Sequence, residues 1–109
     1  MPRARLHDRL RADECARYLK ALADAERLKI VQCLQDGPKN VSELAALLGR
    51  GLVNVSHHLQ VLRHAGLVRG TRHGKYVVYA LHPDVFRPGG GVRPPGRLEL
   101  GCCRIEWGG

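Results

Sequence analysis

The chain has 109 residues, of which 18 are Lys or Arg and 10 are Asp or Glu, so its formal net charge is +8. This length suits a single domain, and the excess of positive charge favours a polyanionic partner such as nucleic acid. No run approaches the about 18 apolar residues that a membrane span requires, and residues 1–9 lack the apolar stretch of a signal peptide. We therefore expect a cytoplasmic protein that does not associate with a membrane and whose four cysteines are thiols.

The first third of the chain predicts two helices. In the first, over residues 12–23, one face carries Cys15, Tyr18, Leu19 and Leu22. Asp24 is a favourable N-cap for the second, which ends at Asp36-Gly-Pro38. The residues expected to be buried by this second helix are Leu28, Ile30, Val31 and Leu34.

Two further helices are predicted in the middle of the chain. Ser42 is expected to cap a short one over residues 43–48 with Leu44, Leu47 and Leu48 facing inward. A turn at Gly49-Arg-Gly51 then leads to a helix over residues 53–65, which Gly66 terminates. Its apolar stripe is Val55, Leu59 and Leu62, and its other face carries hydrogen-bonding side chains.

After Gly66 the pattern changes to short runs rich in Val and Tyr. Residues 67–72 and 75–81 flank His73-Gly74, which predicts a β-hairpin. Two helices joined by a glycine-containing turn and followed by a hairpin are typical of a winged helix-turn-helix. The predicted fold is therefore mainly α with a β-hairpin wing.

The remaining residues differ in composition from the predicted domain. Pro88 to Gly96 contains seven Pro or Gly residues in nine, which is typical of a linker. The residues that follow include Cys102, Cys103 and Trp107. We divide the chain into a DNA-binding and dimerisation domain (1–82), a Pro/Gly-rich linker (83–97) and a Cys-containing C-terminal tail (98–109).

Four segments carry a resemblance to a known family. They are Leu22-Ala-Asp-Ala-Glu-Arg-Leu-Lys-Ile-Val31, Val41-Ser-Glu-Leu-Ala45, Val55-Ser-His-His-Leu-Gln-Val-Leu62 and Ala65-Gly-Leu-Val68. Together with the basic hairpin, residues 12–82 resemble the ArsR/SmtB family of bacterial winged-helix repressors. The resemblance implies a homodimer that binds double-stranded operator DNA and releases it when an inducer binds, often a thiophilic metal ion. The family's thiolate box on the third helix is replaced here by Asn40-Val-Ser-Glu-Leu44, which has no cysteine.

The helix over residues 53–65 is the predicted recognition helix, with Asn54 and His57 as the best candidates for contacts to base edges. Gly51-Leu-Val53 replaces a polar segment common in the family. At the start of the helix, the remaining option for base recognition is apolar contact with thymine methyl groups. Ser56 and His58 are assigned to phosphate contacts or to packing, and the basic hairpin to phosphate or minor-groove contacts. The full set of expected DNA-binding residues is Asn54, Ser56, His57, His58, Arg63, Arg69, Arg72, His73 and Lys75.

The tail thiols are the candidate sensor. Adjacent Cys102 and Cys103 suit a soft ion, with As(III) favoured and Cd(II) as another candidate, but such an ion needs a third ligand. Cys15, from the same chain or its partner, is the preferred third ligand, and Cys33 is the less favoured one. Folding itself is expected to require no cofactor.

Other functions remain open at this point. The same thiols suit a redox or reactive-sulfur sensor, and the fold also suits a DNA-binding regulator without a sensor or a protein-interaction module. The sequence contains no CxxC, no nucleophile–base pair and no cofactor loop, so we do not expect an enzyme such as a thiol reductase.

Overall fold

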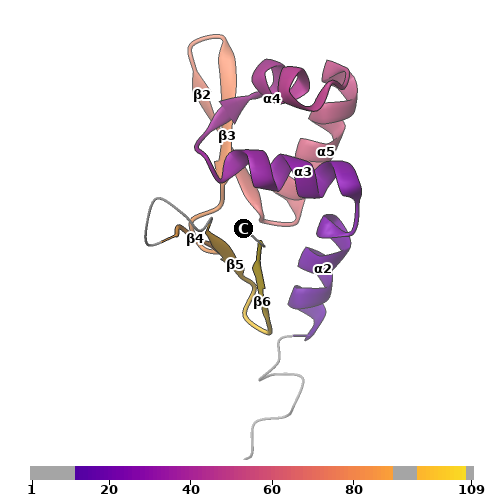
Figure 1. Ribbon diagram of the computed structural model, residues 1–109, viewed down its shortest axis with the longest axis vertical. Coiled ribbons are helices and arrows are strands. Elements are labelled where there is room, and N and C mark those ends of the chain that lie inside the picture. Colours follow the sequence, from indigo (N-terminus) through magenta and orange to yellow (C-terminus); the bar gives the residue numbers. More distant parts are fainter. Residues whose placement is uncertain (1–11, 90–95, 108–109) are drawn as a thin grey trace, which may run out of the picture.

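The computed structural model describes residues 12–89 and 96–107. The helices are α2 (Ala12–Leu22), α3 (Ala25–Leu34), α4 (Val41–Leu48) and α5 (Leu52–His64). The strands are β1 (Lys39–Asn40), β2 (Val68–His73), β3 (Tyr76–Leu81), β4 (Phe86–Arg87), β5 (Arg97–Glu99) and β6 (Arg104–Glu106). In Figure 1 the β2–β3 hairpin and α4 lie at one end of the molecule, and the β5–β6 hairpin and the start of α2 lie toward the other. Helices followed by this hairpin form the winged helix-turn-helix that the sequence predicts.

The core lies where α3 and α5 face each other and the base of the wing. Val55, Leu59 and Leu62 are fully buried along one side of α5, so the predicted stripe is confirmed. Ile30 and Val31 of α3 are likewise buried, as expected. Because buried side chains are closely packed, they hold the two helices in one relative orientation.

Three leucines that were predicted to face inward are exposed instead. Leu28 is about 200° around α3 from buried Ile30 but only about 60° from buried Val31, so it lies at the edge of the buried face. Leu47 is 60% exposed, because Leu44 and Ala45 define the buried side of α4 and Leu47 lies on its flank. Leu19 of α2 is 43% exposed, while Ala21 and Leu22 are buried.

The helix caps confirm one prediction and correct another. Asp24 caps α3, where its carboxylate accepts hydrogen bonds from the backbone N–H groups of Glu26 and Arg27. The prediction that Ser42 caps the next helix is wrong, because α4 begins two residues earlier with Asn40 as its cap. Asn40 and Glu43 form a capping box at 2.8 and 2.9 Å, and an acid three residues after the cap is what this motif requires.

The wing follows α5 after a left-handed glycine, as predicted. Gly66 has φ of 83° and donates its N–H to Arg63, and Leu67 N–H bonds to Leu62. The hairpin turn lies at Gly74-Lys75, one residue later than expected, because His73 is still paired with Tyr76. Strand β1, which the sequence analysis did not predict, pairs with β3 and completes a sheet of order β1-β3-β2.

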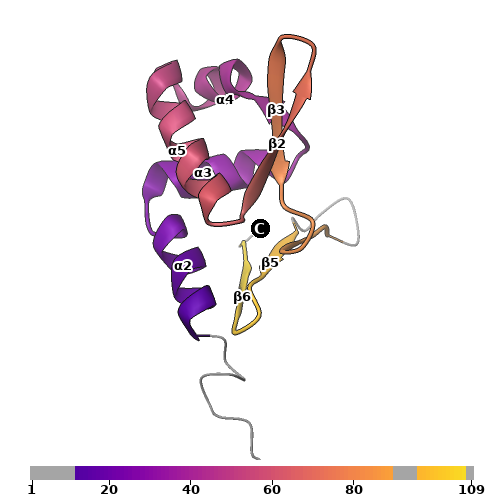
Figure 2. The same ribbon diagram turned by 180° about the vertical axis from the view of Figure 1, so that it is seen from behind.

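The C-terminal residues form a second small sheet against the helices. Strand β5 pairs with β4 on one side and β6 on the other, and Leu98 and Leu100 are buried. Figure 2 shows this sheet on the side of the molecule away from the wing tip. Residues 90–95 of the expected linker and residues 1–11 lie outside the described part of the chain. Over the described ranges, none of the helices is both long enough and apolar enough to cross a membrane.

Candidate functional site

The outer face of α5 carries the side chains that the sequence assigns to base contacts. Asn54 and His57 are exposed, three residues apart, and Ser56 between them is half-buried. Neither α5 nor β2 contains an acidic residue, so no carboxylate on these two elements opposes a polyanion. An α-helix with exposed amide and imidazole groups can enter the major groove and bond to base edges.

His58 is directed toward the interior of the domain instead. Its Nδ1 lies 3.2 Å from Nη1 of Arg27 on α3, and the Arg27 Nε donates to the carbonyl oxygen of Ala21 at the end of α2. Arg27 therefore connects the recognition helix to α2. This role of Arg27 cannot be predicted from the sequence, since nothing in its spacing distinguishes it from a solvated helix residue.

The end of α5 is connected to the wing. Arg63 is exposed and its Nε donates to Oε1 of Gln60 at 2.9 Å, while Nε2 of Gln60 donates to the hydroxyl of Tyr79 on β3 at 3.2 Å. The role of Gln60 likewise cannot be predicted from the sequence. Because these bonds fix the wing against the recognition helix, the two elements can meet DNA as one surface.

The wing itself is basic and open to solvent. Arg69, Arg72 and His73 of β2 are exposed, as is Lys75 in the turn. The Lys75 ammonium lies 5.7 Å from the centre of the Tyr76 ring. Cations on a projecting hairpin suit contacts to the phosphate backbone.

A groove runs between α4 and the first turns of α5. It has a volume of about 510 Å³ and is lined by Val41 and Ser42 from α4 and by side chains of α5 that include Leu52, Val53 and His57. Val53 is 85% exposed and Leu52 is 54% exposed. The reading surface therefore has an apolar part beside its polar one.

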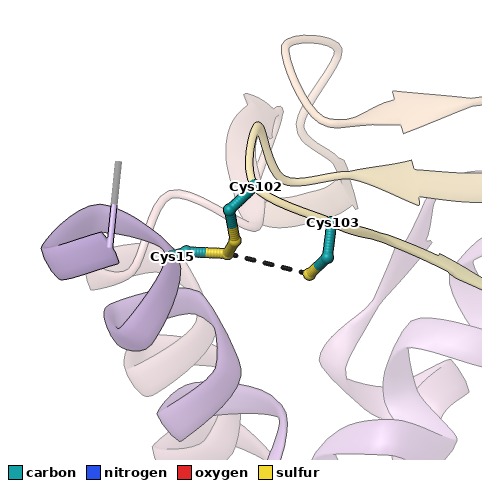
Figure 3. A group of neighbouring side chains, drawn as sticks. All are labelled: Cys15, Cys102 and Cys103. Carbon is teal, nitrogen blue, oxygen red and sulfur yellow. Dashed lines mark hydrogen bonds between the residues drawn. A yellow bond between two sulfur atoms is a disulfide. The ribbon is translucent and has the colours of Figure 1, made fainter. Parts of the chain in front are cut away.

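Three cysteines meet where the C-terminal hairpin contacts α2 (Figure 3). The sulfur atoms of Cys15, Cys102 and Cys103 all lie within 4.8 Å of one another. Cys15 is buried, Cys102 is half-buried and Cys103 is exposed, so the cluster opens to solvent on one side. Its three members come from the same chain: α2 supplies Cys15, and the turn between β5 and β6 supplies the other two.

The expectation that all four cysteines are thiols is wrong for two of them. Cys15 and Cys102 form a disulfide, and the Cys103 sulfur lies 3.7 Å from that of Cys15. The sequence could not show that the tail folds back onto α2, which is what brings residues 87 apart into bonding contact. Cys33 and Cys103 are free, and Cys33 is not part of the cluster.

The donor set of the cluster fits a soft ion once the disulfide is reduced. Thiolates bound to zinc at about 2.3 Å are separated by about 3.8 Å in a tetrahedral site. The separation of 3.7 Å between the sulfurs of Cys15 and Cys103 is close to that value. Burial raises the pKa of the Cys33 thiol, which lowers the fraction of this cysteine present as the reactive thiolate at neutral pH.

Three carboxylates form hydrogen bonds that stabilise the folded structure. The hydrogen bond from the Arg27 backbone lowers the pKa of Asp24, and the hydrogen bond from the Arg50 side chain lowers the pKa of Glu26. In the tail, the Arg97 side chain lowers the pKa of Glu99 in the same way. These carboxylates are therefore ionised at neutral pH and paired with cations.

Known proteins are similar to this chain in sequence. The family model described as a helix-turn-helix domain matches residues 22–71. The HTH-type transcriptional regulator NmtR of Mycobacterium tuberculosis is 45% identical over 71 residues, which cover 65% of this chain and 59% of that protein. The chain thus spans about 60% of the length of the curated relatives it matches.

Two solved structures extend the similarity to the fold. One is the homodimeric winged helix-turn-helix DNA-binding domain of a possible ArsR-family regulator from Mycobacterium bovis, with 32% identity and a TM-score of 0.68 over 77% of this chain and 78% of that one. The other is a possible transcriptional regulator for arsenical resistance, with 36% identity and a TM-score of 0.59 over 62% and 70% of the two chains. With a common fold and this level of identity over most of a solved relative, the chain belongs to the ArsR/SmtB family of winged-helix transcriptional regulators.

Proposed function

We propose that this protein is a homodimeric transcriptional repressor that binds double-stranded operator DNA and releases it when a thiophilic ion, As(III) above others, binds Cys15, Cys102 and Cys103. The observation that carries the sensing part is the convergence of these three sulfurs within 4.8 Å. Three thiolates form a soft donor set that favours such ions over Mg²⁺ or Ca²⁺. The solved relative described as a possible regulator for arsenical resistance supports the same choice.

The DNA-binding part rests on the end of the molecule that carries α4, α5 and the wing. In the proposed complex Asn54 and His57 contact base edges, and Arg69, Arg72 and Lys75 contact phosphates. Two such surfaces in a dimer would enter successive major grooves of a near-palindromic operator about one helical turn apart.

The proposed dimer interface uses α2. Exposed Ala12, Ala16 and Leu19 follow one another at helical spacing along this helix, and exposed Ala23 comes directly after its end. A solvent-facing apolar stripe of this kind suits pairing with the same stripe of a second chain. The homodimeric relative from Mycobacterium bovis supports this assembly.

The link between sensor and DNA is proposed to run through α2. An ion held by Cys15 and the two tail cysteines would fix the tail against the start of this helix. The other end of the helix is bonded by Arg27, which also contacts His58 on the recognition helix. Release then requires that the ion bind the state with weak DNA affinity more tightly, since only differential affinity shifts such an equilibrium.

The sensing proposal is tested by titrating the operator complex of reduced protein with As(III), Cd(II) and Zn(II). A phosphine is the reductant, because a dithiol would compete for the ion. We expect release from wild type and from Cys33→Ser, the matched control whose thiol lies outside the cluster. Cys103→Ser and Cys102→Ser are expected to retain the operator at the same ion concentrations, and release from both variants would refute the tail cysteines as the sensor.

A second candidate is redox sensing, which the disulfide between Cys15 and Cys102 favours. Hydrogen peroxide would oxidise the two thiols to the disulfide while it is reduced to two molecules of water. The two candidates differ at Cys103, which the disulfide does not need. Operator release by peroxide from wild type and from Cys103→Ser alike, with no release by As(III) from reduced wild type, would identify oxidation as the signal.

A further inference from the structure

We propose that Val53, assisted by Leu52, recognises thymine methyl groups in the operator, and that this apolar contact sets sequence preference at the start of the recognition helix. The inference rests on the proposed function, because it names the chemical feature of the DNA that the same surface reads. It assigns specificity to two residues outside the polar set of Asn54 and His57.

The exposure of these side chains is the first observation. Val53 is 85% exposed and Leu52 is 54% exposed, whereas Val55, two positions after Val53 and three after Leu52 on the same helix, is buried. Contact between these exposed apolar side chains and another apolar group removes water from both surfaces, which lowers the free energy of binding. They lie on the first turn of α5, the part of a recognition helix that reaches base edges.

The groove beside them is the second observation. Val53 and His57 are four residues apart and both line it, as do Leu52 and Ser56. An apolar side chain and a hydrogen-bonding side chain thus lie next to each other along α5. The major groove presents a matching pair of features. The methyl group of a thymine is apolar, and the edges of the adjacent bases carry hydrogen-bond acceptors and donors.

Charge selects DNA over a protein as the occupant of this surface. The helix and the adjoining strand β2 carry no acidic side chain, and Arg69, Arg72 and Lys75 are exposed on the wing at the same end of the molecule. Figure 1 shows α4, the start of α5 and the wing tip together at that end. Phosphates held by the wing would bring the first turn of α5 against the bases.

The experiment replaces each operator thymine in turn with deoxyuridine, which differs only by the missing methyl group. The operator is first located by selection from random duplexes, and dissociation constants are measured at one fixed salt concentration. For wild type we expect one or two thymines per half-site at which the change weakens binding about fourfold for each methyl group lost. Other thymines are expected to show no change.

The decisive comparison uses Val53→Ser on the same duplexes. Because Val53 is exposed, the variant is expected to fold like wild type, and circular dichroism checks this. It should bind the thymine and deoxyuridine duplexes equally at the sensitive position. Leu47→Ser, which changes an exposed leucine of α4 that does not line the groove, should keep the wild-type discrimination.

The outcomes separate this inference from the proposed function. Sequence-specific binding without any thymine–deoxyuridine difference, or with the same difference in Val53→Ser, overturns the methyl contact and leaves the repressor intact. Failure to select any preferred duplex overturns both. Loss of discrimination in Leu47→Ser as well would show that the effect does not come from the groove, and would also overturn the inference.

Discussion

Among single residues, Asn40 has the clearest structural role outside the core, because its side chain begins α4 and its backbone belongs to β1. We predict that Asn40→Ala lowers the free energy of unfolding by about 1 kcal/mol, the usual cost of losing an N-cap. Ser42→Ala is the matched control: Ser42 is exposed within the same helix and does not cap it, so a change below about 0.5 kcal/mol is expected. Urea denaturation of both variants decides between the two residues, and a larger loss in Ser42→Ala would contradict the assignment.

Glu26 gives a pH-dependent contribution to stability. The hydrogen bond from Arg50 holds the pKa of Glu26 below its ordinary value of 4.5, so the folded state binds its proton less readily than the unfolded state. This contribution is therefore complete above about pH 4.5 and is lost as the pH falls through the lowered pKa. We predict that the stability difference between wild type and Arg50→Met shrinks from pH 7 to pH 3 in urea denaturation. In a Glu26→Gln background, the effect of Arg50→Met should not change with pH.

Between elements, Arg27 is the side chain that joins three helices. Its guanidinium contacts the Ala21 carbonyl oxygen of α2 and His58 of α5, and its side chain is 16% exposed. We predict that Arg27→Met, which keeps the apolar stem, lowers the free energy of unfolding by about 1–3 kcal/mol, as expected for hydrogen bonds to a charged group. Lys29→Met on the same helix removes only an exposed ion pair with Glu26, so its cost should stay below about 1 kcal/mol. Equal effects in thermal unfolding would argue against the bridging role.

The same elements show what sequence patterns can and cannot predict here. The buried stripe of α5, the Asp24 cap and the left-handed Gly66 follow from local rules, and all three are confirmed. Leu28 and Leu47 were misplaced because a leucine near a helical stripe satisfies the pattern even when no neighbouring element covers it. Contacts between elements, such as that of Arg27 with His58, depend on tertiary placement and leave no periodic signal.

For the site, the sequence supplied the residue types but not their arrangement. The DNA-binding residues and the ligand set remain predictions, although the structure brings Cys15 to the tail cysteines and leaves Cys33 apart. The sequence predicts a tail that follows a linker, because the Pro and Gly residues mask the short strands. Leu98 and Leu100 give the tail apolar groups that can dock, but the surface that buries them is set by long-range packing, which composition cannot reveal.

For the whole molecule, the disulfide connects the first described helix to the last hairpin. It closes a loop with a sequence separation of 87 residues, which restricts the unfolded chain. We predict that oxidised protein is more stable than reduced protein by about 2–5 kcal/mol, measured by urea denaturation with and without a phosphine. Cys102→Ser should abolish this difference, whereas Cys33→Ser and Cys103→Ser should preserve it. Equal stability of the oxidised and reduced wild type would contradict the prediction.

The start of α2 and the β5–β6 hairpin, which carry the cysteine cluster, lie toward the opposite end of the fold from α4 and the wing tip (Figure 1), and Cys103 is open to solvent. In the proposed repressor, an operator covering the wing and α5 therefore leaves the sulfurs accessible. An inducer can then act on the protein–DNA complex directly, through a ternary intermediate, without waiting for spontaneous dissociation. The speed of derepression would follow the supply of inducer, even on an operator whose complex is long-lived.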